Sequence, residues 1–109
     1  MRATIRLASP ADQQAQLDDW LAQPSNGRRA VIAESGLVPL DAPDDVPLAR
    51  LAPGCVCCVG QVPLRVTLTR TVRAHRPHEV LLLLATADHL ARVRALLEDG
   101  SVGVRFEVE

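Results

Sequence analysis

Val80-Leu81-Leu82-Leu83-Leu84 is an uninterrupted apolar run in the second half of the chain. A strand that is apolar on both faces is typical of the centre of a parallel sheet covered by helices on both sides. A helix should follow it, because the next apolar residues recur at helical spacing and a glycine then ends the pattern. These residues are Leu90, Val93, Leu96 and Leu97, followed by Gly100. The run therefore predicts an α/β fold with Val80 to Leu84 as an inner strand.

The chain before this run alternates between expected strands and helices. Thr4 to Ala8 and Ala30 to Ala33 have the character of short strands. Between them, Ser9-Pro10-Ala11-Asp12 is a typical helix start, with a Ser cap, a Pro in the first turn and an acid three residues after the cap. Leu17, Trp20 and Leu21 continue it as an apolar stripe at helical spacing. This order predicts a βαβ unit.

Three further segments complete the expected fold. Ser35 to Pro47 is rich in Pro and Asp, which indicates a loop, and Leu48 to Leu51 follows as a short strand. Val102 to Val108 alternates apolar and polar residues, as expected of a half-exposed edge strand. Together the elements predict one three-layer α/β domain over residues 1–109, with a mostly parallel five-stranded sheet and right-handed crossovers.

Gln61 to His75 fits both a strand and a helix. Its apolar residues alternate with polar ones from Val62 onward and its threonines are β-branched, which favours a strand. Leu64, Leu68 and Val72 also form an i, i+4, i+8 stripe, and the segment is longer than a usual strand. We expect a helix here. A strand, and with it an antiparallel β-sandwich, is the alternative.

Composition excludes several classes of partner. The 109 residues carry a net charge of −1, and aromatic residues make up 2% of the chain. A neutral chain without aromatic platforms is not suited to nucleic acid or to an acidic membrane surface. The N-terminus lacks the apolar run of a signal peptide, and no stretch is long enough to span a bilayer. We therefore expect a cytoplasmic protein.

Gly54-Cys55-Val56-Cys57-Cys58 holds all three cysteines of the chain. In a reducing compartment such a cluster indicates thiols or metal ligands rather than structural disulfides. Three converging sulfurs suit zinc or copper(I), although a closed zinc site needs a fourth ligand that no adjacent residue supplies. The alternatives are small buried hydrophobes at a strand end, or a vicinal thiol pair with redox chemistry.

The run G-C-V-C-C resembles the G-C-x-C-C signature of the CobW-type P-loop GTPases, a family linked to metal handling. Ala33 to Asp41 (A-E-S-G-L-V-P-L-D) is similar to the family segment N-E-F-G-E-V-G-I-D, and Arg76 to Val80 falls where the family approaches its next strand. The resemblance covers Thr4 to Glu109 and implies a P-loop-NTPase-like half domain. It also implies a metal role for Glu34.

Three nucleotide-binding motifs of that family are missing here. Leu7 to Asp12 stands where the family has its G-x-x-G-x-G-K-[ST] phosphate loop, without the Gly or the Lys. Ala85 to Leu90 replaces the family's E-T-S-G-L-A-D-P segment. The chain has no lysine at all, so no N-K-x-D guanine motif exists. The resemblance therefore implies a degenerate, truncated relative that neither binds nor hydrolyses GTP and is not an enzyme.

These observations predict a non-catalytic metal-binding module related to metallochaperones. Its expected zinc ligands are Cys55, Cys57, Cys58 and Glu34, with a solvated loop carboxylate as the alternative for Glu34. A protein-interaction module without metal, binding a protein partner or a second copy through the Val102 to Val108 edge, is the alternative function. His75 and His78 are expected at the surface, and His89 is a further candidate ligand because it follows the inner strand.

Overall fold

The computed structural model describes residues 1–25, 27–51, 62–88 and 90–109. It contains one five-stranded sheet of order β3-β2-β4-β1-β5, in which every pairing is parallel. In chain order the elements are β1 (Arg2–Leu7), the short 3-10 helix η1 (Pro10–Asp12), α1 (Gln13–Ala22), β2 (Arg29–Ala33), β3 (Leu48–Arg50), α2 (Val62–His75), β4 (Glu79–Leu84), α3 (Leu90–Glu98) and β5 (Glu107–Val108). The expected α/β class is confirmed, and the sheet is entirely rather than mostly parallel.

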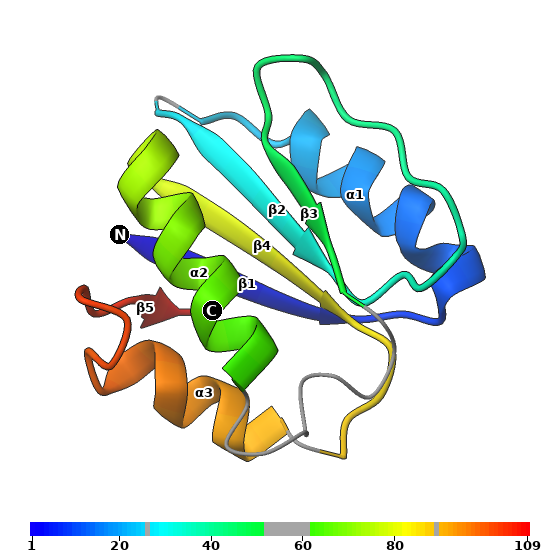
Figure 1. The fold of residues 1–109 in the computed structure, drawn as a ribbon. Coiled ribbons are helices and arrows are strands. Elements are labelled where there is room, and N and C mark those ends of the chain that lie inside the picture. Colours follow the sequence, from blue (N-terminus) through cyan, green and yellow to red (C-terminus); the bar gives the residue numbers. More distant parts are fainter. Residues whose placement is uncertain (26, 52–61, 89) are drawn as a thin grey trace.

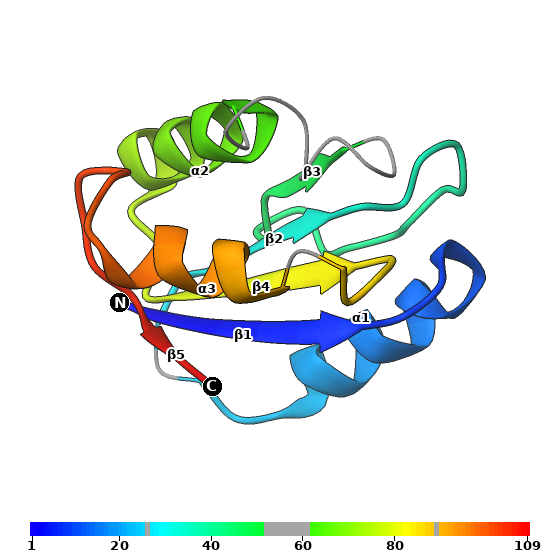
Figure 2. The same cartoon turned by 90° about the horizontal axis from the view of Figure 1, so that it is seen from below.

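Helices cover both faces of the sheet. α1 lies on one face, and α2 and α3 lie on the other (Figures 1 and 2). The connection from β1 to β2 passes β4 in one direction along the sheet, whereas those from β3 to β4 and from β4 to β5 run in the other. Right-handed crossovers that run in opposite directions place their helices on opposite faces. The strand order therefore accounts for the three layers.

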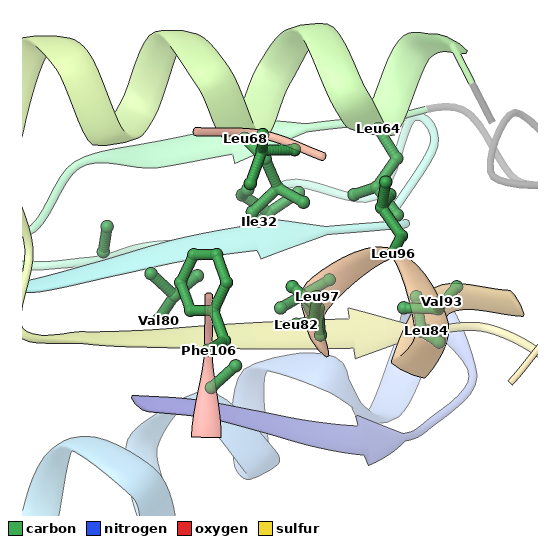
Figure 3. Close-up of a cluster of buried hydrophobic side chains, with 13 residues drawn as sticks. Ile32, Leu64, Leu68, Val80, Leu82, Leu84, Val93, Leu96, Leu97 and Phe106 are labelled. Carbon is green, nitrogen blue, oxygen red and sulfur yellow. The ribbon is translucent and has the colours of Figure 1, made fainter. Parts of the chain in front are cut away.

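β4 is the inner strand that the apolar run predicts. It pairs with β1 along its whole length, with Glu79 opposite Arg2 and Leu84 opposite Leu7. It pairs with β2 on its other side. Leu82 and Leu84 face α2 and α3, in the cluster drawn in Figure 3, whereas Leu81 and Leu83 pack with Leu17 and Trp20 of α1. Both faces of β4 are buried, and this is why its sequence is apolar without alternation.

The segment from Gln61 to His75 is a helix over its described part, as expected. α2 runs from Val62 to His75 and buries Leu64 and Leu68 against the sheet. The antiparallel sandwich is excluded by the same observation. Ser35 to Pro47 forms a loop without helix or strand, as expected. Gln14 holds this loop to α1, because its amide group exchanges hydrogen bonds of 2.7 and 2.9 Å with the backbone of Asp41.

The expected edge strand from Val102 to Val108 is wrong for most of its length. Only Glu107 and Val108 pair with β1. The preceding residues turn through Gly103, whose φ is +94°, and Phe106 donates its amide to the carbonyl of Leu97 in α3. Val102 and Phe106 are nevertheless buried. The alternating burial is real, but it arises from packing beneath α3 rather than from a sheet ladder.

The start of the first helix also differs in detail. Ser9 precedes η1, which Pro10 begins and Asp12 ends, and α1 starts only at Gln13. The Ser9 hydroxyl donates to the Asp12 carboxylate at 2.9 Å instead of capping a backbone amide. Within the described ranges, no helix combines the length and the apolar character needed to cross a membrane.

Candidate functional site

Four strands of the parallel sheet end at the same edge, which we call the carboxyl edge. Ala8 follows β1, Glu34 follows β2, Leu51 follows β3 and Ala85 follows β4. β1 and β4 are neighbours, yet the chain leaves them for opposite faces, toward α1 and α3 (Figure 2). Parallel α/β sheets bind their ligands outside the carboxyl ends of such a strand pair. The carboxyl edge is therefore the place to look for a site.

Glu34 is built into this edge. Its residue is only 5% exposed, and its Oε1 accepts the backbone N–H of Ala85 at 2.7 Å. Its own amide donates to the carbonyl of Leu83 at 2.8 Å. The carboxylate therefore bridges the end of β2 to the end of β4. A solvated loop carboxylate, which was the alternative for this residue, is not what the structure contains.

Gln13 is a second polar residue at the edge, and sequence reasoning missed it. Its side chain is completely buried at the start of α1. Nε2 donates to the carbonyls of Ala8 and Glu34, both at 3.1 Å, while Oε1 is buried without a hydrogen-bond partner in the described part of the chain. The signal was available: Gln13, Leu17 and Trp20 are spaced i, i+4, i+7 and therefore share the inward face of α1.

Ser35 lines a cavity beside these two residues. Its hydroxyl is buried and has no hydrogen-bond partner among residues 1–25, 27–51, 62–88 and 90–109. The cavity has a volume of about 590 Å³ and is lined by Pro10, Ser35, Gly36, Leu37, Val38, Arg50 and Leu51. Arg50 adds a charge to this apolar lining and donates from Nη2 to the carbonyl of Gly36 at 2.9 Å. The edge thus combines an apolar hollow with polar atoms that have no hydrogen-bond partner in the part of the chain that the structure describes.

Cys55, Cys57 and Cys58 lie outside the described residues, as does His89. The structure does describe how the chain leaves β3 toward them. The amide of Leu51 donates to the carbonyl of Ala33 at 2.8 Å, and its carbonyl accepts the amide of Gly36 at 3.2 Å. In the described ranges, no three His, Cys, Asp or Glu side chains gather closely enough to hold a metal ion.

The segment between β1 and α1 offers little to an anion. Ala8 is tied to the sheet, because its amide donates to the carbonyl of Leu84 at 2.9 Å. Pro10 has no amide hydrogen, and the amide of Asp12 is already bonded to the carbonyl of Ser9 at 2.8 Å. The Asp12 side chain is exposed at this turn. Few backbone amides are therefore available for an anion, and a carboxylate stands among them.

His75 and His78 are both exposed and lie at the opposite, amino edge of the sheet. Nδ1 of His78 accepts the amide of Arg28 at 3.1 Å, and the carbonyl of His75 accepts Nε of the same arginine at 3.0 Å. This agrees with their expected place at the surface. Neither residue belongs to the carboxyl edge, so they do not extend the candidate site.

No protein-family model, curated protein or solved structure matches this chain. The interpretation of the carboxyl edge therefore rests on its own residues and geometry.

Proposed function

We propose that the chain is a non-catalytic metal-binding module that holds one zinc ion with Cys55, Cys57, Cys58 and Glu34. The observation that carries the proposal is the pair of hydrogen bonds that Leu51 makes on either side of Glu34, to Ala33 and to Gly36. Through these bonds the chain leaves the sheet beside the backbone of Glu34, whose carboxylate is held on the β4 side by Ala85, and the cysteine run follows in the sequence. Leu51 and Cys55 are four positions apart, which corresponds to at most about 14 Å of extended chain.

The donor set fits zinc. Zinc takes thiolate sulfur and carboxylate oxygen in four-coordinate sites without redox chemistry. A carboxylate ligand is normally held in place by a hydrogen bond of its own, and the Ala85 amide supplies one to Glu34. The buried Oε1 of Gln13 lies on a side chain that also binds the Glu34 carbonyl, so it offers a further oxygen close to the same residue. These features support a preorganised carboxylate at this edge.

The second part of the proposal is that the fold is a P-loop-NTPase-like half domain without nucleotide chemistry. Support comes from the β1–α1 segment, where Pro10 lacks an N–H, the amide of Asp12 is used by Ser9 and the Asp12 carboxylate would repel phosphate. The absence of lysine from the whole chain points the same way. We therefore assign the protein to metal binding and not to GTP hydrolysis. Calorimetric titration with GTP and magnesium tests this part, and a saturable micromolar site would contradict it.

Metal analysis tests the zinc site directly. Protein purified without chelator or affinity-tag histidines should hold about one zinc per chain, as expected of one closed structural site. Cys57→Ser should remove that zinc, and Glu34→Gln should weaken it by at least about 10-fold in a chelator competition. The Gln side chain keeps an oxygen that accepts the Ala85 amide, so Glu34→Gln should fold normally. Asp45→Asn is the matched control, because Asp45 is an exposed carboxylate of the loop.

The outcomes separate the alternatives. Zinc affinity should fall as the pH is lowered, because the thiols must lose their protons to bind. Unchanged zinc affinity in Glu34→Gln would mean that Glu34 only bridges β2 to β4 and does not bind zinc. Wild-type protein that holds no zinc after reconstitution, with no effect of Cys57→Ser, would overturn the proposal and leave an interaction module without metal.

A further inference from the structure

The charges of this chain are unevenly distributed between the two faces of its sheet, although α3, which shares the face of α2, carries Glu98. No Asp or Glu occurs between Asp45 and Glu79, and this stretch contains α2 with its exposed Arg65, Arg70 and Arg73. α1 and the loop after β2 carry the opposite charge. Their carboxylates are Asp12, Asp18, Asp19, Asp41, Asp44 and Asp45. α1 and α2 lie on opposite sides of the sheet (Figure 2), so one molecule presents a basic and an acidic side.

The basic side contains a hollow. It has a volume of about 400 Å³ and is lined by Arg65, Val66, Thr69, Arg70 and Ser101. Neither Arg65 nor Arg70 forms an ion pair with any carboxylate in the described ranges, and both residues are exposed. Asp99 places one negative charge near Arg65, although its carboxylate accepts its hydrogen bonds from the amide and the hydroxyl of Ser101. Around Val66, which is 43% exposed, the hollow therefore presents two guanidinium groups that form no ion pair with the described residues.

The acidic side contains an exposed turn whose charge is opposite to that of the hollow. The amide of Val46 donates to the carbonyl of Pro43 at 2.9 Å and closes a turn with Asp44 and Asp45 at its tip. Both aspartates are exposed and take part in no ion pair in the described part of the chain. Pro43 and Pro47 flank the turn and restrict its backbone. A preorganised turn loses less conformational entropy on binding than a flexible loop does.

We propose that the Pro43–Val46 turn of one copy docks into the Arg65–Arg70 hollow of a second copy. The turn leads into β3, at one edge of the sheet, and Ser101 leads toward β5, at the opposite edge. The contact is therefore between molecules. It joins two different surfaces, so it is a head-to-tail contact that repeats from copy to copy.

Charge and chemistry favour this occupant over a polyanion. A guanidinium group binds a carboxylate through two parallel hydrogen bonds, and two arginines face two aspartates here. The chain as a whole is slightly negative, at −1, so a nucleic acid or an acidic membrane gains no general attraction. The acidic turn is the complementary surface that the molecule itself provides. A contact of this kind is small and electrostatic, so it should be weak and sensitive to salt.

A complementary charge reversal tests the contact. Sedimentation velocity at low ionic strength should show self-association of the wild-type chain as its concentration rises toward about 1 mM. In about 1 M salt, where the screening length falls to about 3 Å, the chain should be monomeric. Arg65→Glu/Arg70→Glu and Asp44→Arg/Asp45→Arg should each lower the association constant at least about 10-fold. An equimolar mixture of the two variants should restore association, because the reversed surfaces attract each other.

Two further variants make the test specific. Arg73→Glu/Arg92→Glu changes the net charge by the same amount at exposed residues that do not line the hollow, and it should associate like the wild type. Arg65→Gln/Arg70→Gln, checked by circular dichroism, replaces the hollow variant if the two glutamates prevent folding. A wild-type chain that stays monomeric overturns the proposal, whether or not a poly-glutamate peptide then binds the hollow. Failure of the mixture to associate, or equal loss in the Arg73/Arg92 control, also overturns it.

Discussion

The two edges of the sheet use polar side chains in different ways. At the amino edge, Arg28 donates from its guanidinium to the carbonyls of His75 and Arg76, and Arg29 donates from Nη1 to the carbonyl of Leu21 at 3.0 Å. Arg29 also lies 5.1 Å from the Trp20 ring centroid, and its Nε forms an ion pair of 3.5 Å with Oε2 of Glu79. At the carboxyl edge, Gln13 and Ser35 keep neutral polar atoms that lack a hydrogen-bond partner among the described residues, whereas the third such atom, Nε of Arg29 at the amino edge, faces the Glu79 carboxylate.

This difference suggests different roles for the two edges: the amino edge stabilises the fold, and the carboxyl edge keeps polar atoms for a ligand. Polar atoms that are buried without partners cost free energy, so a fold keeps few of them. The amino edge uses its arginines to satisfy carbonyl groups, and its role is to hold elements together. At the carboxyl edge, Ser35 lines a cavity, and the Gln13 amide oxygen belongs to a side chain that binds the Glu34 carbonyl. We interpret that edge as the one that accepts a ligand.

The largest expected effect comes from breaking the amino edge. Arg29→Ala should lower the free energy of unfolding by about 3 kcal/mol, because it leaves Glu79 without its cation and uncovers Trp20. Trp20 is the only tryptophan, so its fluorescence reports urea unfolding. Arg28→Ala is the control. It removes only exposed bonds to carbonyls and should cost about 1 kcal/mol. Equal losses in the two variants would contradict the special role of Arg29.

A smaller loss is expected from the carboxyl edge. Gln13→Ala removes two hydrogen bonds from a completely buried side chain and should lower stability by about 2 kcal/mol. Gln23→Ala, at an exposed position just after α1, should change stability by less than about 0.5 kcal/mol. The same urea titration measures both. A neutral Gln13→Ala would mean that Gln13 does not brace Ala8 and Glu34.

Removing the Ser35 hydroxyl, which has no hydrogen-bond partner among the described residues, should not destabilise the fold. Ser35→Ala should leave the free energy of unfolding unchanged or raise it by up to about 1 kcal/mol, since the desolvation penalty of the Ser35 hydroxyl disappears. Urea unfolding measures this as well. If the variant is instead destabilised by more than about 1 kcal/mol, the hydroxyl has a partner in the folded protein and the contrast between the edges is weakened.

The smallest expected effect concerns an exposed carboxylate that belongs to neither edge. Two hydrogen bonds from Ser101 hold the pKa of Asp99 below its usual value, and the bond from the hydroxyl contributes more than the bond from the amide. A depressed folded-state pKa stabilises the fold above the unfolded pKa, and this contribution is lost as the pH falls through the folded value. Ser101→Ala should raise the pKa of Asp99, which a carboxyl NMR titration measures. An unchanged titration would show that the Ser101 hydroxyl is not needed, and that the Ser101 amide together with Arg65 and Arg105 lowers the pKa.

Sequence reasoning succeeded where the pattern is local. The apolar run of β4, the stripe of α3 and the i, i+4, i+8 stripe of α2 each reflect burial of one element's own residues. The same local view failed for Val102 to Val108, because alternating burial does not reveal which backbone the residues bond to. It also missed Gln13, whose inward position was legible but whose partners Ala8 and Glu34 come from other segments.

The sequence by itself therefore determined the order and type of most elements, because helix and strand patterns follow from the periodicity of apolar residues. Only the tertiary structure decided the strand order β3-β2-β4-β1-β5, and with it which loops meet at the carboxyl edge. It also decided that Glu34 is buried and bonded to Ala85, fifty-one positions further along the chain. The reason is physical: the partners of a polar group at a sheet edge depend on which strands become neighbours, and that is a property of long-range packing.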